Sequence, residues 1–240
     1  MLASRAFLMK ICLIPARGGS KRIPRKNIRE FRGRPMIAWS ILAAQESACF
    51  DRIIVSTDDE EIADVARSFG AEVPFLRPAC LADDQATTQD VISHALDWFQ
   101  QQRMICEALC CLYATAPFVQ PTDLQSAEKN LRNASVGTVV FAATSFAFPI
   151  QRAVRIDSEG YSSMFQPDQY ATRSQDLEEA FHDAGQFYWA TPQTWGTVVN
   201  LFEGARPILL PRWRVQDIDT EEDWCRAELM HQLLEQQALP

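Results

Sequence analysis

The sequence predicts an α/β protein built on a doubly wound, mostly parallel β-sheet. Short apolar runs rich in Ile, Leu and Val alternate with stretches whose apolar residues recur at helical spacing, as in strand–helix–strand units. The first apolar run ends at Pro15 and meets the pair Gly18-Gly19, as expected where a buried strand runs into a ligand-facing turn. A chain of 240 residues with 47% hydrophobic content can bury one sizeable core. We therefore expect one domain over residues 1–240.

The expected elements alternate regularly in the first part of the chain. Strands are predicted from uninterrupted apolar runs, and helices from amphipathic spacing that begins at Pro or acidic residues. The expected strands are 11–15, 52–57, 73–76, 108–113 and 136–143, and the expected helices are 35–44, 58–70, 90–101 and 121–131. Active sites of open parallel sheets lie beyond the carboxyl ends of the strands. The loops after Pro15, Thr57 and Tyr113 are therefore expected to converge on one rim.

The pattern changes from Phe148 onward. Residues 153–157 alternate, 158–160 form a turn and 161–165 return, which predicts a β-hairpin. We expect an excursion from the domain over about residues 148–180 that packs on another subunit, because isolated two-stranded units are marginally stable. The sheet is then expected to resume at 186–190, followed by a helix at 194–199, a strand at 207–210 and a last helix at 221–236 capped by Thr220 and Asp223.

Composition excludes several classes of protein. The net charge of −8 disfavours general binding to nucleic acids or anionic membranes, and no apolar run is long enough for a membrane span. Seven cysteines, odd in number and without a C-x-x-C pair, indicate a reducing compartment, so we expect a cytoplasmic protein. The apolar patch of the leader continues into the glycine turn without a cleavage site, which disfavours a signal peptide. Met9 is an alternative start, with Met1–Leu8 as an extension.

The basic loop, defined here as residues 17–34, contains eight Lys or Arg side chains and one acidic residue, Glu30. Because the rest of the chain is strongly acidic, this loop is expected to bind a small polyanion. The backbone of Gly18 and Gly19 and the hydroxyl of Ser20 offer donors to a phosphate. A glycine turn kept for steric reasons is the alternative, since neither the P-loop nor the dinucleotide spacing is present.

Asp217 and Asp219 form a second candidate site. In an extended segment, residues two apart point to the same side while Ile218 turns to the core. Two carboxylates on one side suit Mg²⁺ held jointly with substrate phosphates. The alternative is that Asp219 only caps the last helix.

The stretch from Ile14 to Ile28, IPARGGSKRIPRKNI, resembles the signature of the acylneuraminate cytidylyltransferase family, whose members activate nine-carbon acidic sugars. Its ending is most similar to the pseudaminic acid branch. The loop Tyr113–Pro117 is similar to that branch too, because the sialic acid enzymes carry Gln at the Tyr113 position. The resemblance implies a Rossmann-like nucleotidyltransferase that is a homodimer through its excursion and that makes a CMP-sugar and pyrophosphate from CTP and a nonulosonic acid.

The resemblance also implies roles for individual residues. Arg17 and Lys21 would neutralise the triphosphate, and Asp217 and Asp219 would hold Mg²⁺. The other expected CTP contacts are Ala16, Gly18, Gly19, Ser20, Asn27, Arg77 and Thr88. The expected contacts to the sugar acid are Tyr113, Thr115, Arg173, Gln175, His182, Gln186, Phe187 and Tyr188. From spacing alone, Asn27 serves equally well to lock the basic loop.

Two alternative functions stay open at this point. Within the same class, the sugar is sialic, legionaminic or octulosonic acid. From another class, the chain is a catalytically silent regulator that binds a nucleotide. The presence of Arg17, Lys21, Asp217 and Asp219 together argues against the regulator. A metal-bound hydroxide and a carboxylate both fit as the base that takes the proton of the sugar hydroxyl.

Overall fold

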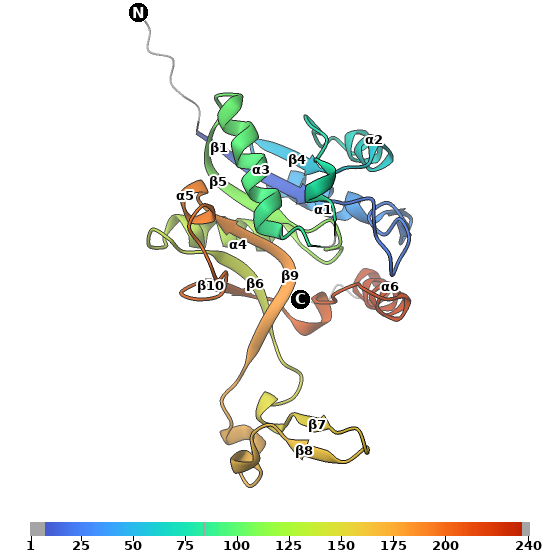
Figure 1. Ribbon diagram of the computed structural model, residues 1–240, viewed down its shortest axis with the longest axis vertical. Coiled ribbons are helices and arrows are strands. Elements are labelled where there is room, and N and C mark those ends of the chain that lie inside the picture. The colour runs from blue at the N-terminus through green and yellow to red at the C-terminus, as the bar shows by residue number, and fades with distance from the viewer. Residues whose placement is uncertain (1–7, 84, 237–240) are drawn as a thin grey trace, which may run out of the picture.

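The computed structural model describes residues 8–83 and 85–236, so most of the expected extension Met1–Leu8 lies outside the described residues. Its centre is a six-stranded sheet in the order β10-β6-β9-β5-β1-β4 (Figure 1). β9 runs antiparallel to both of its neighbours, whereas the other pairs are parallel. The prediction of a mostly parallel α/β sheet is confirmed, with one reversed strand that the sequence did not indicate.

The main helices and strands follow one another in the order expected from the sequence. The strands of the sheet are β1 (Leu8–Pro15), β4 (Arg52–Ser56), β5 (Ile105–Leu112), β6 (Val140–Ser145), β9 (Phe181–Ala190) and β10 (Arg206–Leu209). The helices are α1 (Met36–Ser47), α2 (Glu60–Ser68), α3 (Thr88–Gln101), α4 (Pro121–Arg132), α5 (Pro192–Trp195) and α6 (Glu221–Gln236). Two short antiparallel pairs stand apart from the sheet, β2 (Glu30–Phe31) with β3 (Arg34–Pro35) and β7 (Val154–Ile156) with β8 (Ser162–Met164).

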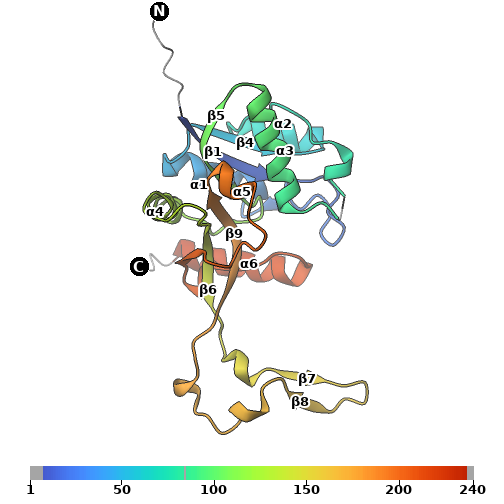
Figure 2. The same cartoon turned by 60° about the vertical axis from the view of Figure 1, so that its left-hand side comes forward.

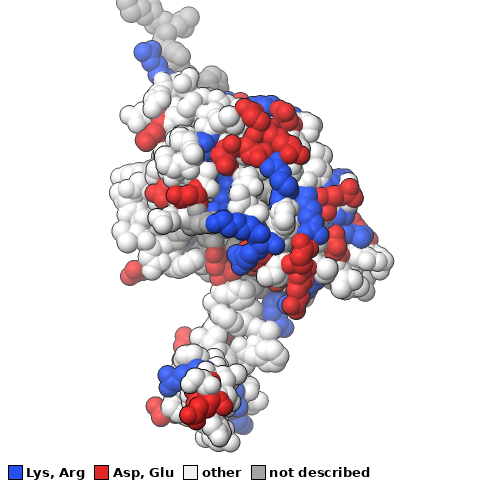
Figure 3. All heavy atoms as spheres, turned by 45° about the vertical axis from the view of Figure 1, so that its right-hand side comes forward, with Lys and Arg blue, Asp and Glu red and all other residues white. Residues whose placement is uncertain are grey.

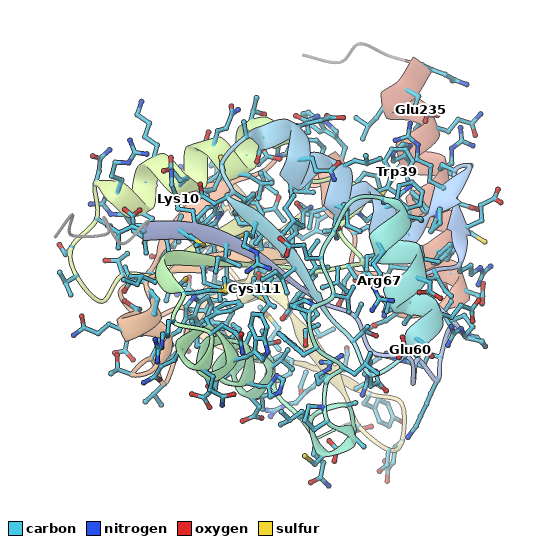
Figure 4. The ribbon with its side chains drawn as sticks, turned by 90° about the horizontal axis from the view of Figure 1, so that it is seen from above. Lys10, Trp39, Glu60, Arg67, Cys111 and Glu235 are labelled. Carbon is cyan, nitrogen blue, oxygen red and sulfur yellow. The ribbon has the colours of Figure 1, made fainter. Side chains whose placement is uncertain are left out.

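Helices cover both faces of the sheet. On one face, α1, α2 and α4 bury residues such as Ile41, Ile62 and Leu124 against the sheet, and on the other face α3 and α5 bury Phe99 and Trp195. Cys110 and Cys111 belong to opposite faces, as expected for neighbours in a strand. Figure 4 shows Cys111 in the interior and Glu60 and Arg67 on the outer helix α2.

Three expected elements differ in the structure. The expected strand 73–76 is wrong, because only isolated bridges from Glu72 and Leu76 reach Ile54 and Thr57 of the β4 region. β6 begins at Val140 and not at Val136, whose side chain is exposed. α3 begins two residues earlier than expected, because Thr87 and Asp90 form a capping box.

The connectivity places a crevice at the carboxyl ends of β1 and β5. β4 and β5 follow β1 in the chain but pair with opposite sides of it. Helices that leave neighbouring strands in opposite directions open a crevice at such a switch point, where ligands of open α/β sheets bind. The loops after Pro15 and Leu112 both begin there.

A third buried cluster joins the basic loop to α6. It contains Phe31 of β2 and Trp224 of α6, whose rings contact edge to face with centroids 5.5 Å apart. The guanidinium of Arg29 lies 4.4 Å from the ring centroid of Trp224, a cation–π distance. Ile218 is fully buried in the same cluster, so the segment before α6 is fixed against the basic loop.

The arm, defined here as residues 146–180, leaves the sheet after β6 and returns at β9. It includes the hairpin β7–β8 and projects away from the main body in both views (Figures 1 and 2). Exposed large apolar side chains gather on it: Phe148, Ile156, Tyr161, Phe165 and Tyr170. A concentration of exposed apolar side chains of this kind marks an interaction surface. Among the described residues, none of the helices is both apolar enough and long enough to cross a bilayer.

Candidate active site

The crevice at the switch point contains a pocket of about 210 Å³, here called the loop pocket. It opens between the basic loop, the loop after β5 and the segment before α6. Its lining residues are Pro15, Arg17, Ser20, Lys21, Arg22, Ile23, Lys26, Asn27, Tyr113, Ala114, Thr115 and Asp219. The space-filling view shows Lys and Arg side chains gathered on this side of the body with Asp and Glu beside them (Figure 3).

Asp219 faces the basic loop directly. One carboxylate oxygen lies 2.8 Å from Nη2 of Arg22, and the other lies 3.3 Å from Nζ of Lys26. Lys26 Nζ also donates to the backbone carbonyl of Ile218 at 2.6 Å. The two stretches that the sequence analysis singled out separately therefore meet across one pocket.

The glycine turn is packed against the start of α2. The Gly18 N–H donates to Oδ1 of Asp58 at 2.9 Å, and a Cβ at Gly18 would lie only 2.7 Å from Oδ2 of Asp59. Asp59 is held in place because it caps α2 at Ile62 N–H and binds both terminal nitrogens of Arg25. The Arg25 guanidinium holds the pKa of Asp59 below its usual range. Glycine is needed at position 18 because the neighbouring carboxylate leaves no room for a side chain.

The other residues expected to contact CTP differ in their surroundings. Asn27 is buried and its Nδ2 donates to the Arg17 carbonyl at 2.9 Å, as the loop-locking alternative predicts, and Asn27 also lines the loop pocket. The N–H of Ala16 donates to Ser56 O at 2.9 Å and its methyl group lies in the core. Gly19 has open space beside it. The Thr88 hydroxyl lies 2.9 Å from the Tyr113 hydroxyl, which places Thr88 behind the wall of the loop pocket.

Arg77 carries a buried and incompletely paired guanidinium. Its side chain is 4% exposed, and among the described residues its Nε and Nη2 have no hydrogen-bond partner. Burial lowers its pKa, the charge of Asp58 raises it and the charge of Arg17 lowers it. Unpaired buried donors are costly, so this group is suited to bind an anion.

Asp217 and Asp219 offer the donor set that a divalent cation needs. Burial raises the pKa of Asp217, and the charge of Asp219 raises it further, although Asp217 still borders solvent. Two carboxylates that repel each other gain most from a shared cation, and carboxylate oxygens suit Mg²⁺. Over the parts of the chain that the structure describes, no group of three or more acidic, His or Cys side chains is placed to hold a metal ion, so phosphate oxygens and water would complete the coordination of such an ion.

A second pocket of about 430 Å³ adjoins the first at the aspartate pair. Asp217 lines this second pocket and Asp219 lines the loop pocket, so the pair stands between them. His182 lies in its wall, as do two cations, Arg212 and Arg226, that the sequence analysis missed. No motif marks these arginines, and only their closeness in the chain to Asp217 and Asp219 could have suggested them.

Several residues expected to contact the sugar lie elsewhere. Phe187 is fully buried in the core, which corrects the expectation that its side chain faces a substrate. Tyr188 is also buried and donates its hydroxyl to Asp183, and burial raises its pKa far above the usual range. Gln186 is 3% exposed and donates to the Arg214 carbonyl at 2.6 Å. None of these three neighbours on β9 lines either pocket.

Arg173 and Gln175 lie on the arm and line neither of the two pockets. The Arg173 side chain is exposed, and its Nε donates to Asp176 at 2.7 Å. Tyr113 and Thr115, by contrast, both line the loop pocket. Within one subunit, the structure therefore brings together part of the expected sugar contacts and leaves the arm residues apart.

Comparisons with known proteins show the family to which this chain belongs. The family model described as "Cytidylyltransferase" matches residues 11–189. The chain is 44% identical to the pseudaminic acid cytidylyltransferase of Campylobacter jejuni subsp. jejuni serotype O:23/36 (strain 81-176), over 94% of this chain and 97% of the relative. It is 35% identical to the CMP-N,N'-diacetyllegionaminic acid synthase of Legionella pneumophila, over 93% of this chain and 96% of that one. A solved structure of CMP:2-keto-3-deoxy-manno-octonic acid synthetase complexed with CTP superposes with a TM-score of 0.67 and 15% identity, covering 95% of this chain and 99% of that one.

The raised pKa of Asp217 predicts that Asp217→Asn stabilises the protein in metal-free buffer at neutral pH. Because the folded-state pKa lies above the unfolded value, ionisation of Asp217 opposes folding. This cost is complete above the folded pKa and disappears below the unfolded one. Thermal unfolding should show a Tm up to about 4 °C higher for the variant near pH 7, with no difference near pH 3. A lower Tm for the variant at neutral pH would contradict this account.

Proposed function

Because this chain belongs to the cytidylyltransferase family, we propose that it transfers CMP from CTP to the anomeric hydroxyl of a nonulosonic acid and releases pyrophosphate. The observation that carries the proposal is the meeting of Asp219 with Arg22 and Lys26 across the loop pocket. The family resemblance predicted from Ile14–Ile28 is confirmed by the comparisons. Pseudaminic acid is the proposed sugar, since identity is 44% to the pseudaminic acid enzyme and 35% to the legionaminic acid enzyme.

The basic loop would bind the triphosphate of CTP. Arg17 and Lys21 line the loop pocket and supply cations, while Ser20 supplies a hydroxyl. The turn that carries these groups accepts a hydrogen bond from Asn27 at the Arg17 carbonyl and packs against Asp59 at Gly18, contacts that would limit its reorganisation during the reaction. Donors fixed in advance around a developing charge are the largest source of catalysis in reactions of this kind.

The aspartate pair would hold Mg²⁺ between the nucleotide and the sugar. When bound, the ion offsets the charge that builds up on the departing pyrophosphate. Arg22 and Lys26 pair with Asp219 in the structure and remain beside the loop pocket, where phosphate oxygens are alternative partners for them.

The sugar acid would occupy the second pocket. Arg212 and Arg226 lie in its wall, and an arginine pairs bidentately with a carboxylate. The anomeric hydroxyl would then attack the α-phosphorus from the side of Asp217. A bond forms between the sugar oxygen and phosphorus, the bond to the bridging oxygen breaks with its electron pair leaving on pyrophosphate, and the hydroxyl proton passes to a base, for which a carboxylate and a metal-bound hydroxide both fit. Holding the two reactants in adjoining pockets supplies the proximity that this displacement needs.

The direct test is to incubate the purified chain with CTP, Mg²⁺ and, one at a time, pseudaminic, legionaminic, sialic and octulosonic acids. We expect pyrophosphate release and a CMP-sugar with pseudaminic acid at the highest kcat/KM. A higher kcat/KM with another of these acids would replace pseudaminic acid as the substrate. CTP binding without pyrophosphate release from any of them would instead favour the nucleotide-binding regulator.

Lys21→Ala and Asp219→Asn should separate binding from turnover. Removing the Lys21 ammonium is expected to raise the KM for CTP about 10- to 100-fold, because hydrogen bonds to charged groups contribute about 1.5–3 kcal/mol. Asp219→Asn is expected to lower kcat about 100-fold or more, with the fold retained in circular dichroism. Wild-type kinetics in either variant would remove that residue from the proposed site.

The arm is proposed to join two copies of the chain in a homodimer. Its exposed apolar side chains need a partner surface, and a second copy would carry Arg173 and Gln175 to a pocket that they do not reach in their own subunit. Ile156→Glu should therefore shift sedimentation from dimer to monomer and reduce turnover. Val199→Glu, at an even more exposed apolar position away from the arm, is the control and should leave the dimer intact. A wild-type chain that sediments as a monomer would overturn the proposal.

We also place the protein in the cytoplasm. All seven cysteines are free thiols in the structure, including Cys12 and Cys110, which face each other across β1 and β5. A reducing compartment suits that state.

A further inference from the structure

A buried ion pair fastens the segment before α6 to the start of α4. Nη1 of Arg214 lies 2.6 Å from Oδ2 of Asp123, and Nη2 lies 3.1 Å from Oδ1, so the two side chains pair through both nitrogens and both oxygens. These side chains are only 11% and 8% exposed. Neither residue lines the loop pocket or the second pocket, so the pair is not itself a substrate contact.

Both partners of this ion pair are close in the chain to residues that line the pockets. Asp123 also accepts the Gln120 N–H at 2.9 Å, which ties it to the end of the loop after β5. The beginning of that loop lines the loop pocket. Arg214 precedes Asp217 by three residues and Asp219 by five. The pair therefore relates the loop on one side of the crevice to the aspartates on the other.

Gln186 gives the same segment a second attachment. Its Nε2 donates to the Arg214 carbonyl at 2.6 Å, and its own carbonyl accepts the Tyr113 N–H at 2.8 Å. The side chain of Arg214 is thus held by α4 and its backbone by β9.

The position of the Asp217 carboxylate depends on its backbone more than that of Asp219 does. Arg22 and Lys26 bind the Asp219 carboxylate directly, and the adjacent Ile218 is fully buried. Among the described residues, the carboxylate of Asp217 has neither a hydrogen bond nor an ion pair. The attachment at Arg214 therefore has most effect on where Asp217 lies.

Stability alone explains the buried pair poorly. Removing two charges from water is costly, and apolar pairs of similar volume are often at least as stable. A bidentate arginine–carboxylate pair adds direction, because the planar guanidinium and the carboxylate meet in one geometry. The contact is therefore suited to fix the register between α4 and the segment that carries the aspartates.

We propose that Arg214 and Asp123 are positioning residues for Asp217, which hold residues 212–219 so that the Asp217 carboxylate stays at the junction of the two pockets. This inference rests on the proposed function, because it takes the displacement to occur where the pockets adjoin. Without the pair, CTP still binds at the basic loop. The segment then moves, and Asp217 spends less time where the sugar hydroxyl meets the α-phosphorus.

The test is the double variant Arg214→Met/Asp123→Asn. It removes both charges together, so no buried charge loses its partner, and the Asn side chain can still accept the Gln120 N–H. We expect a Tm close to wild type and a KM for CTP within about twofold of it. The kcat should be about tenfold lower, because a small displacement at the reacting groups slows turnover strongly. Hydrogen exchange without ligand should be about fivefold faster over residues 212–219.

Lys10 and Glu128 provide a matched control pair. Nζ of Lys10 lies 2.9 Å from Oε1 of Glu128, so this pair also fastens α4, in this case to β1, and it lines neither pocket. Lys10→Met/Glu128→Gln should leave the kcat, the KM for CTP and the exchange of residues 212–219 unchanged. An equal loss of kcat in this control would overturn the proposal, because any attachment of α4 would then serve.

Arg214→Lys keeps the positive charge and loses the paired geometry. Its kcat should lie between those of the wild type and the double variant, with the KM for CTP unchanged. If the double variant does not fold, wild-type kcat and exchange in Arg214→Lys would overturn the proposal.

The two readouts separate this inference from the proposed function. Wild-type kcat in a folded double variant, whatever its exchange, would overturn the positioning role and leave the proposed function intact. A loss confined to the KM for CTP would do the same. A wild-type chain that turns over none of the acids would overturn the proposed function, whereas faster exchange over residues 212–219 in the double variant would still show that the pair fixes the segment.

Discussion

The attraction between Asp219 and the cations Arg22 and Lys26 joins two distant parts of the chain at one pocket. It depends on the packing beneath it, where Ile218 and Trp224 are buried with Phe31. Surface ion pairs contribute little to stability by themselves. Burial of the apolar cluster therefore stabilises the contact between the two segments, and the ion pairs fix their relative position. The sheet brings the strand ends to one rim, and the buried apolar cluster holds the last helix against the basic loop.

Much of this arrangement could be predicted, because helix caps and the alternation of polar and apolar residues agree with the burial seen in the structure. The last helix spans Glu221–Gln236 as expected, since Thr220 and Asp223 form its cap and leave no freedom in where it begins. The alternation predicts the burial of Ile218, which the structure confirms, whereas Asp217 and Asp219 line two different pockets and not one. The reversed direction of β9 could not be predicted, because an apolar run buried on both faces carries no signal of strand direction.

The errors at the candidate site have a similar cause. Phe187 and Tyr188 lie in a short stretch in which apolar and polar side chains are all buried, so the sequence pattern did not separate core from pocket. Arg212 and Arg226 were missed because two scattered arginines form no motif until α6 and the preceding loop bring them together. The sequence pattern places Asp58 with Asp59 in the acidic start of a helix, and only the structure shows that the two carboxylates have different partners.

The reversed strand also explains how the arm is attached. β6 and β9 are adjacent and antiparallel, so the whole arm is topologically the loop of one wide hairpin. Such a loop can lengthen, shorten or be exchanged while the order of the surrounding strands stays the same. Its two ends also enter the body next to Thr144 and His182, beside the second pocket. A change at the tip of this insertion is therefore linked to the second pocket through two short strand ends. Substitutions in the arm could alter assembly and the shape of this pocket together, while the rest of the fold stays the same.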